Sequence, residues 1–361
     1  MGRRTPLADV LVERIRRDGP LTFAAYMEAC LYHPEHGYYS QGRSARGRGD
    51  YFTSPDVGPL FARLLLVQLR EMWEALGRPP RFDLVECGAG RGCLAAQLLA
   101  AGAEQGSDFG AALRLTLVEA SAKLRAEAEV VLGSKARIAD ELPRHGIVGC
   151  IFSNELLDAL PVHRVVQRSS GLRAIYVAAD GDALREVEGE LASPALAQYW
   201  EKYGARLEED QCAEINLEAL EWLEKAAAAL ERGFLLTIDY GYRARELYGP
   251  AHRRGTLLAY HEHRAEENWL DSPGEQDLTA HVNFTALEER GKELGLTSLG
   301  LVPQSSFLLS LSRAGGLDEM DAAARRQLIQ LIHPEGMGET FKVLIQAKNV
   351  ETATLAGLAP L

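Results

Sequence analysis

The chain has 361 residues, of which 47% are hydrophobic and 25% charged, a composition typical of a globular protein with a sizeable core. Its formal net charge of −12 argues against a nucleic-acid-binding protein and would attract a basic partner. Five cysteines without a C-x-x-C pair indicate reduced thiols rather than a disulfide framework or a zinc site. No long apolar run or signal region stands out, so we expect a cytoplasmic protein that does not insert into a membrane.

The N-terminal segment is predicted to begin with two helices. Hydrophobic spacing places them at residues 7–17 and 23–31, with Thr22 as the N-cap of the second. Residues 42–49 then form a basic, glycine-rich segment. A solvated loop and a lid over a substrate are both compatible with this composition.

A long helix is expected after this segment. Thr53 or Ser54 can cap it, and helical spacing of apolar residues continues until Gly77. We therefore assign residues 1–78 to an N-terminal helical cap and lid segment, and expect the capped helix start to lie near a ligand.

The stretch FDLVECGAGRGCLAAQLL is predicted to form a buried strand, a glycine turn and a helix start. Gly88, Gly90 and Gly92 permit a close approach of a ligand to the main chain, and the following helix directs free N–H groups toward it. Cys93 stands where the dinucleotide fingerprint needs its third glycine. The carboxylate of Glu86 repels pyrophosphate but suits the cationic amino-acid end of S-adenosylmethionine, which we favour over NAD. Glycines that serve packing alone remain the alternative.

Strands and helices alternate after the glycine turn, which predicts an α/β fold with a doubly wound, mostly parallel, seven-stranded sheet of the Rossmann-like kind. If the strand before the glycine turn is counted as the first, the further expected strands are 113–119, 136–139, 147–153, 234–239, 297–302 and 341–347. The expected helices are 121–132, 213–231 and 284–294. This second domain covers residues 79–361. It carries two inserts, at about 162–212, where residues 162–191 read as antiparallel hairpins, and at 242–280, which looks irregular.

Acidic residues follow the second and third of these strands. Glu119 can accept both hydroxyls of a ribose, because the competing role of helix N-cap is already filled by Ser121. Asp140, Glu141 and Leu142 come directly after the third strand, where they would meet an adenine ring. The carboxyl ends of the strands are therefore the expected nucleotide site.

The fourth strand leads to Asn154, Glu155 and Asp158. Methyl transfer from a sulfonium is an in-line displacement that requires a close, aligned acceptor with a free lone pair. Paired carboxylates suit a guanidinium acceptor, because they bind its fork of donors and can take its proton. Glu155 and Asp158 are three residues apart, so a helical turn would place them on one side. Acids that only stabilise a helix start are an equally good reading of these residues alone.

Two further groups are less informative. Asp239, before Tyr240 and Gly241, ends the fifth strand and is another candidate for the edge of the pocket. His261 and His263, with His281, lack a clear carboxylate partner, so an ordinary polar loop is favoured and no metal is expected.

Taken together, the motifs resemble the MidA family of class I S-adenosylmethionine-dependent methyltransferases, over nearly the whole chain and in order. The matching motifs are Glu86-Cys87-Gly88-Ala89-Gly90-Arg91-Gly92, Tyr26-Met27, His33-Pro34-x-x-Gly37-Tyr38-Tyr39, Gly49-Asp50-Tyr51-Phe52-Thr53-Ser54-Pro55, Asn154-Glu155-Leu156-Leu157-Asp158, Asp239-Tyr240-Gly241, Gly255-Thr256-Leu257, and residues 277–284 and 336–344. The family includes the mitochondrial assembly factor of respiratory complex I, which dimethylates an arginine of a core subunit. One departure is Cys87-Gly88-Ala89, where relatives often have Leu-Gly-Pro.

The resemblance implies S-adenosyl-L-methionine as cofactor, a protein-arginine acceptor and catalytic roles for Glu155 and Asp158. The expected cofactor contacts are Thr53, Ser54, Glu86, Gly88, Ala89, Gly90, Gly92, Glu119, Ala120, Asp140, Glu141, Leu142 and Asn154. The N-terminus and the basic segment look like those of a bacterial member, whose acceptor is a subunit of respiratory NADH dehydrogenase (complex I) or another protein. The rival interpretations are an assembly chaperone and a nicotinamide-dependent oxidoreductase. A homodimer through the inserts is compatible with the sequence, which fixes neither the acceptor nor the number of methyl groups added.

Overall fold

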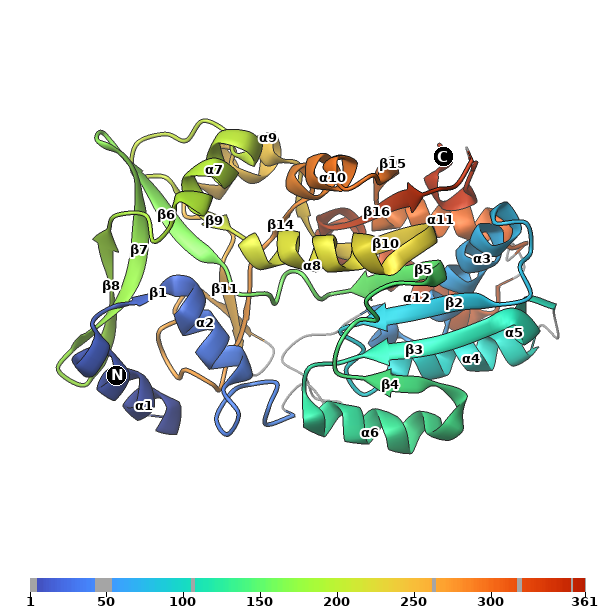
Figure 1. Ribbon diagram of the computed structural model, residues 1–361, viewed down its shortest axis with the longest axis horizontal. Coiled ribbons are helices and arrows are strands. Elements are labelled where there is room, and N and C mark those ends of the chain that lie inside the picture. Colours follow the sequence, from blue (N-terminus) through green and yellow to red (C-terminus); the bar gives the residue numbers. More distant parts are fainter. Residues whose placement is uncertain are drawn as a thin grey trace. The chain divides into compact units, whose positions relative to one another are not determined.

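The computed structural model describes residues 5–42, 54–104, 108–261, 264–316, 320–351 and 353–360. The chain forms two compact units, shown as one ribbon in Figure 1. The hairpin unit comprises Met1–Tyr51, Leu157–Glu221 and Gly241–Glu289, and the large-sheet unit comprises Phe52–Leu156, Trp222–Tyr240 and Arg290–Leu361. Across the described ranges, no helix has both the length and the apolar character needed to cross a membrane.

The large sheet is mixed. Its strands are β2 (Phe82–Cys87), β3 (Leu113–Val118), β4 (Arg137–Ala139), β5 (Ile147–Asn154), β10 (Leu230–Tyr242), β15 (Thr297–Pro303) and β16 (Phe341–Lys348). They follow the order β15-β16-β10-β5-β2-β3-β4, and the short β14 (Val282–Asn283) also pairs with the end of β10. Neighbours from β4 to β10 run parallel, whereas β16 is antiparallel to both β10 and β15. The predicted α/β fold is confirmed, and the doubly wound arrangement of its helices stays a prediction.

The core of the large-sheet unit explains its continuous apolar strands. Every residue of β2 is buried, as expected of a parallel strand that is covered on both faces. Phe82, Leu84, Phe152 and Leu236 are all fully buried in one hydrophobic cluster with the inner face of α3 (Leu60–Ala75). Each such side chain contributes about 1.5–3 kcal/mol to the stability of the fold when it leaves water. The packed core therefore stabilises the sheet whose edge carries the candidate site.

Helix α3 starts later than the sequence predicts. Residues Ser54–Val57 form only a 3-10 turn, and Gly58 then takes φ +142 before the helix begins at Leu60. The expected cap by Ser54 is wrong, because the Ser54 hydroxyl donates instead to Gln304 Oε1 at 3.2 Å. Thr53, the alternative cap, lies outside the described residues. Helix α3 belongs to the large-sheet unit, although the sequence suggests that residues up to 78 form one N-terminal segment.

Other helices were only partly foreseen. The predicted ones appear as α1 (Pro6–Asp18), α2 (Phe23–Tyr32), α6 (Ala122–Leu132), α8 (Leu217–Ala229) and α10 (Phe284–Glu293), with α4 (Cys93–Glu104) after the glycine turn. Not foreseen were α5 (Asp108–Ala112), α7 (Pro194–Tyr203), α9 (Ala244–Leu247), α11 (Gln304–Ala314) and α12 (Ala322–Ile332). In α11 the apolar period is obscured, because the polar residues Gln304, Ser305 and Ser310 are themselves buried.

The hairpin unit contains two antiparallel sheets. The first has the order β1-β7-β6-β9, with β8 on β7, and is built from β1 (Leu21–Thr22), β6 (His163–Arg168), β7 (Gly171–Asp180), β8 (Ala183–Gly189) and β9 (Cys212–Ile215). The second has the order β12-β11-β13, from β11 (Leu258–His261), β12 (Arg264–Glu266) and β13 (Asp277–Thr279). The predicted hairpins are thus confirmed. The helix expected from residue 213 is wrong over its first residues, which pair with β6, and the supposedly irregular insert contains a sheet.

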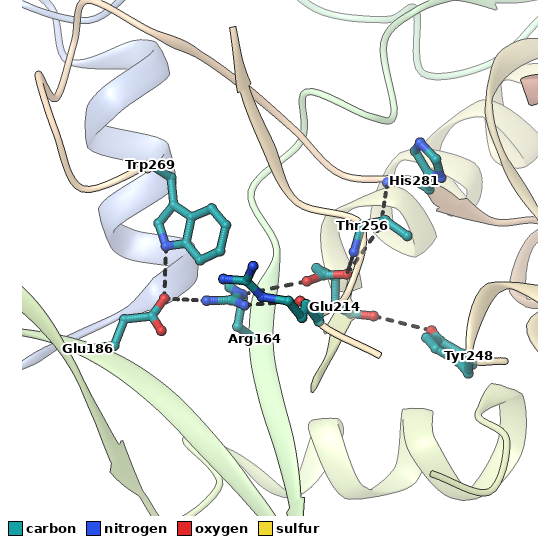
Figure 2. Close-up of polar contacts among 8 residues, drawn as sticks. Arg164, Glu186, Glu214, Tyr248, Thr256, Trp269 and His281 are labelled. Carbon is teal, nitrogen blue, oxygen red and sulfur yellow. Dashed lines mark hydrogen bonds and ion pairs between the residues drawn. The ribbon is translucent and has the colours of Figure 1, made fainter. Parts of the chain in front are cut away.

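A buried charge cluster joins the strands of the hairpin unit (Figure 2). Arg164 on β6 is 3% exposed and forms ion pairs with Glu186 of β8 and Glu214 of β9. Its guanidinium also lies 4.3 Å from the ring centroid of Trp269, whose indole N–H donates to Glu186 at 2.8 Å. Glu214 accepts hydrogen bonds from the main chain and the hydroxyl of Thr256. The cluster therefore ties three strands to the segment that contains Thr256 and Trp269.

We expect Arg164→Ala to lower the free energy of unfolding by about 3–5 kcal/mol, because it leaves the buried Glu214 carboxylate without its cation. Urea unfolding monitored by tryptophan fluorescence measures the loss. The control is Arg168→Ala, which removes a neighbouring arginine of β6 that pairs with Glu188 and Asp210 at the surface. The control should shift the midpoint far less. Equal losses in the two variants would contradict a special role for the buried cluster.

Candidate functional site

The candidate site lies in the large-sheet unit, at the carboxyl ends of β2 and β5. These parallel strands are neighbours, and the chain leaves β2 toward β3 on one side while β10 follows β5 on the other. At such a switch point the connections diverge and leave a crevice for a ligand. Glu86 stands near the end of β2 and Asn154 at the end of β5, so the sheet brings the two acidic segments of the sequence to one edge.

Glycine is needed at different positions of the turn after β2 for different physical reasons. All three have positive φ, with +71 at Gly88, +54 at Gly90 and +78 at Gly92. A Cβ on Gly88 would lie 2.9 Å from the Leu156 side chain, so packing excludes a larger residue there. A Cβ on Gly90 would meet nothing within 4 Å. Packing therefore does not account for Gly90, whose main chain faces open space where a ligand can approach.

Glu119 is fixed by backbone donors on both sides. Its Oε2 accepts the N–H of Gly90 at 2.9 Å, and its Oε1 accepts the N–H of Ser121 at 2.8 Å. Burial raises the pKa of this carboxyl, and the two N–H groups oppose that shift. Ser121 is the N-cap of α6, as predicted, since its hydroxyl accepts the N–H of Leu124. Glu119 is therefore not the cap, and each of its oxygens has a further lone pair for a hydroxyl donor.

Glu86 is a buried acid. It is 4% exposed, and its Oε2 has no hydrogen-bond partner in the part of the chain that the structure describes. Burial and, secondly, the nearby charge of Glu119 raise the pKa of Glu86 to about 8. A buried acceptor of this kind requires a donor. The ammonium group of an amino acid would supply one, so the residues fit the methionine end of S-adenosylmethionine.

The segment after β4 lies beside Glu119. The N–H of Glu119 donates to the carbonyl of Ala139, the last residue of β4. Asp140 and Glu141 follow and are exposed, and Leu142 is half-buried. This order places the three residues predicted to meet adenine next to the residue predicted to hold the ribose, and their contacts with adenine stay a prediction.

Glu155 is held in an unusual conformation. It has φ +55, and its Oε1 accepts hydrogen bonds from the Ser54 N–H at 3.2 Å and the Asn154 amide at 2.9 Å. The helical turn that the sequence analysis expects after β5 is wrong, because the chain bends and turns here without forming a helix. Glu155 and Asp158 therefore do not lie on one face of a helix, although they are three residues apart. Asp158 is described within the hairpin unit, where it is 1% exposed and its carbonyl accepts the N–H of Ala280.

Two features of the structure were missed or underused by the sequence analysis. Leu156, which packs over Gly88, carries no sequence signal for that contact. The hairpin unit also contains a pocket of about 190 Å³. Among the residues that line it are Arg254, Thr256, Trp269 and His281. Thr256 donates to Glu214 and Trp269 to Glu186 (Figure 2), and the carbonyl of Arg254 accepts a hydrogen bond from Arg164. In the sequence, the Gly255-Thr256-Leu257 motif and His281, within the motif at 277–284, are the signals that fall on the lining of this pocket.

No group of three His, Cys, Asp or Glu side chains that could hold a metal ion occurs among the residues described. His263, one member of the sequence candidate, lies outside them, and so do residues 43–49. His261 Nδ1 lies 3.0 Å from the carbonyl oxygen of Glu275, so it donates its Nδ1 proton to the main chain of its own unit.

Comparison with known proteins decides the family. The model of a family of S-adenosyl-L-methionine-dependent methyltransferases matches residues 64–302, which contain the glycine turn, Glu119 and Glu155. This chain belongs to that family. It is therefore an S-adenosyl-L-methionine-dependent methyltransferase, as the sequence predicts.

Two kinds of relative support the assignment. The chain is 30% identical over 379 residues to the rat protein named "Protein arginine methyltransferase NDUFAF7, mitochondrial", covering 93% of this chain and 83% of that one. The human protein of the same name is 29% identical, with coverage of 93% and 82%. A crystal structure of a COG1565 superfamily member from Burkholderia thailandensis bound to S-adenosyl-homocysteine has a TM-score of 0.88 and 32% identity, covering 99% of this chain and 98% of that chain.

We expect Gly90→Val to weaken the binding of S-adenosylhomocysteine by at least about a hundredfold, because a β-branched side chain is strained at positive φ and fills the open space. Isothermal titration measures the affinity. Gly133→Val is the matched control, since Gly133 has φ +55 and also nothing within 4 Å, but follows the far end of α6. The control should be strained equally and bind normally. Loss of binding in both variants would mean that folding, not the turn, was affected.

Binding of S-adenosylhomocysteine at pH 7 should release up to about one proton per site, because Glu86 is protonated below its pKa of about 8 and an ammonium partner favours its carboxylate. Titrations in buffers of different ionisation enthalpy measure this release. In Glu86→Gln the release should disappear. An unchanged release in that variant would assign the proton to another group.

The same pKa predicts how the stability of the cofactor-free protein changes with pH. The folded state holds the Glu86 proton up to about pH 8, whereas the unfolded chain loses it near the ordinary value of 4.5. Between these pH values the folded state therefore binds more protons than the unfolded chain. The contribution of Glu86 to the free energy of unfolding falls as the pH rises. Urea unfolding at pH 5 and pH 8 should show that Glu86→Gln gains stability relative to the unsubstituted protein at the higher pH. An equal difference at both pH values would contradict the raised pKa.

Proposed function

We propose that this methyltransferase acts on an arginine side chain of a protein, with a subunit of respiratory NADH dehydrogenase (complex I) as the first acceptor to test. The observation that carries the proposal is the Glu155 carboxylate, which is held at the end of β5 in the same unit as the glycine turn. The name of the mammalian relatives, protein arginine methyltransferase, supports an arginine acceptor. A cytoplasmic location and a homodimer stay predictions from the sequence.

In this proposal the large-sheet unit holds the cofactor by its two polar ends. Glu119 accepts the ribose hydroxyls through the lone pairs that the Gly90 and Ser121 N–H groups leave free, and Glu86 accepts the ammonium group of the methionine end. The remaining contacts that we assign to the cofactor are Ser54, Gly88, Ala89, Gly90, Gly92, Ala120, Asp140, Glu141, Leu142 and Asn154, together with Thr53 outside the described residues. The bound cofactor supplies a methyl group on a positively charged sulfur.

Glu155 acts on the acceptor. A guanidinium is protonated at neutral pH and has no nitrogen lone pair to attack with. As the new N–C bond forms and the S–C bond breaks, one proton must leave the guanidinium, and we assign the Glu155 carboxylate as the group that orients the nitrogen and takes that proton. Asp158 is the second carboxylate that we assign to the acceptor. Because Ser54 and Asn154 both donate to Glu155 Oε1, the side chain is oriented before the acceptor binds.

Glu155→Gln should lower kcat by about 10²–10⁴-fold, because the amide cannot take a proton. Binding of S-adenosylhomocysteine should change by less than about threefold, since the amide keeps the size and one acceptor oxygen. The assay transfers labelled methyl groups from S-adenosylmethionine to purified complex I subunits, and mass spectrometry locates the methylated residue.

Glu71→Gln is the matched control. Glu71 is also a half-buried glutamate of the large-sheet unit, and it also accepts one backbone N–H, from Ala356, and one amide, from Gln68. It should leave both kcat and binding unchanged. Equal loss of turnover and binding in Glu155→Gln would make Glu155 a cofactor residue. Full support of complex I assembly by an inactive Glu155→Gln variant would favour the chaperone instead.

A further inference from the structure

We propose that Asp239, at the carboxyl end of β10, is the positioning residue that fixes Glu155 against the glycine turn. This inference rests on the proposed function of Glu155 and adds a residue to which no role in the reaction has been assigned. Asp239 is fully buried. Its two carboxylate oxygens bind two different backbone N–H groups. Oδ2 accepts the N–H of Leu156 at 3.2 Å, and Oδ1 accepts the N–H of Tyr240 at 2.9 Å.

The Leu156 N–H belongs to the peptide unit directly after Glu155. The peptide unit before Glu155 is also held by β10, since the Glu155 N–H donates to the carbonyl of Ile238 at 2.9 Å. Both peptide units that flank the Glu155 Cα atom are therefore bonded to consecutive residues of one strand. This pair of bonds defines the left-handed conformation of Glu155, at φ +55.

That conformation needs support. A non-glycine residue at positive φ costs about 1–2 kcal/mol relative to the right-handed region, and it persists only where the surroundings determine it. Relaxation of φ to a negative value would rotate the Glu155 side chain away from the Ser54 and Asn154 donors that bind its Oε1. The buried Asp239 carboxylate is the group that opposes this relaxation.

The same contact also sets the distance between Glu155 and the cofactor turn. The Leu156 side chain packs so closely over Gly88 that a Cβ on Gly88 would lie 2.9 Å from Leu156 Cδ1. The Leu156 N–H is bonded to Asp239. Asp239 therefore orients Glu155 and seats Leu156 on the turn at the same time.

A carboxylate is required because two N–H groups need two acceptor oxygens. Asparagine has nearly the same shape but offers one oxygen, and its NH₂ group would face an N–H donor. Asp239→Asn is therefore a sharp test. The matched control is Asp83→Asn, which also removes a buried carboxylate that accepts a backbone N–H, from Val148, but at the amino end of β2.

Hydrogen–deuterium exchange, read at single amides, tests the positioning without any acceptor. In Asp239→Asn, exchange at Leu156 should accelerate by about tenfold or more, the equivalent of one lost hydrogen bond to a charged group. In Asp83→Asn, exchange at Leu156 should be unchanged. Unchanged exchange at both Leu156 and Tyr240 in Asp239→Asn would overturn the proposal.

A double-mutant cycle on turnover tests whether Asp239 acts through Glu155. Asp239→Asn alone should lower kcat by about tenfold to a hundredfold, the cost of a small misplacement, with the KM for S-adenosylmethionine changed by less than about threefold. In the Glu155→Gln background the same substitution should have almost no further effect on kcat. Losses that multiply, or a parallel loss of S-adenosylhomocysteine binding, would show that Asp239 only maintains the fold. If Glu155→Gln by itself left turnover intact, the proposed function would fail, and the exchange rates would still decide whether Asp239 positions the turn.

Discussion

Acidic side chains at the carboxyl ends of parallel strands must find donors, and the large-sheet unit is arranged around that need. Glu119 takes its donors from Gly90 and Ser121, and Asp239 takes its donors from Leu156 and Tyr240. Three of these four N–H groups come from the chain just after a strand, and the fourth, that of Tyr240, belongs to β10 itself. These hydrogen bonds therefore stabilise both the carboxylate side chains and the main-chain segments that donate to them.

Glu86 is the exception that gives the edge its chemistry. It is buried, one of its oxygens lacks a donor within the described residues, and its pKa is raised to about 8. A protein that buries such a group accepts a cost in stability. A cationic group placed beside this oxygen would remove that cost, so the same atom that destabilises the free protein would favour a bound cation.

In the hairpin unit, acidic side chains are stabilised by an arginine side chain as well as by backbone donors. The buried Glu214 and half-buried Glu186 share the cation of Arg164 rather than backbone donors alone. One long side chain can reach two strands and the Trp269 ring at once (Figure 2). The result is a fixed frame behind the pocket that contains Thr256 and Trp269.

Local patterns in the sequence were enough to predict the glycine turn, the alternation of strands and helices, the hairpins at 162–191 and Ser121 as the N-cap of α6. Each depends on residues that are close in the chain. The start of α3, strand β9 and the bend at Glu155 could not be predicted in this way. Their partners, Gln304, β6 and Asp239, lie far away in sequence. Sequence alone thus determined the family and the glycine turn, whereas the tertiary structure decided how Glu155 is held, because its conformation depends on hydrogen bonds to a strand 83 residues further along the chain.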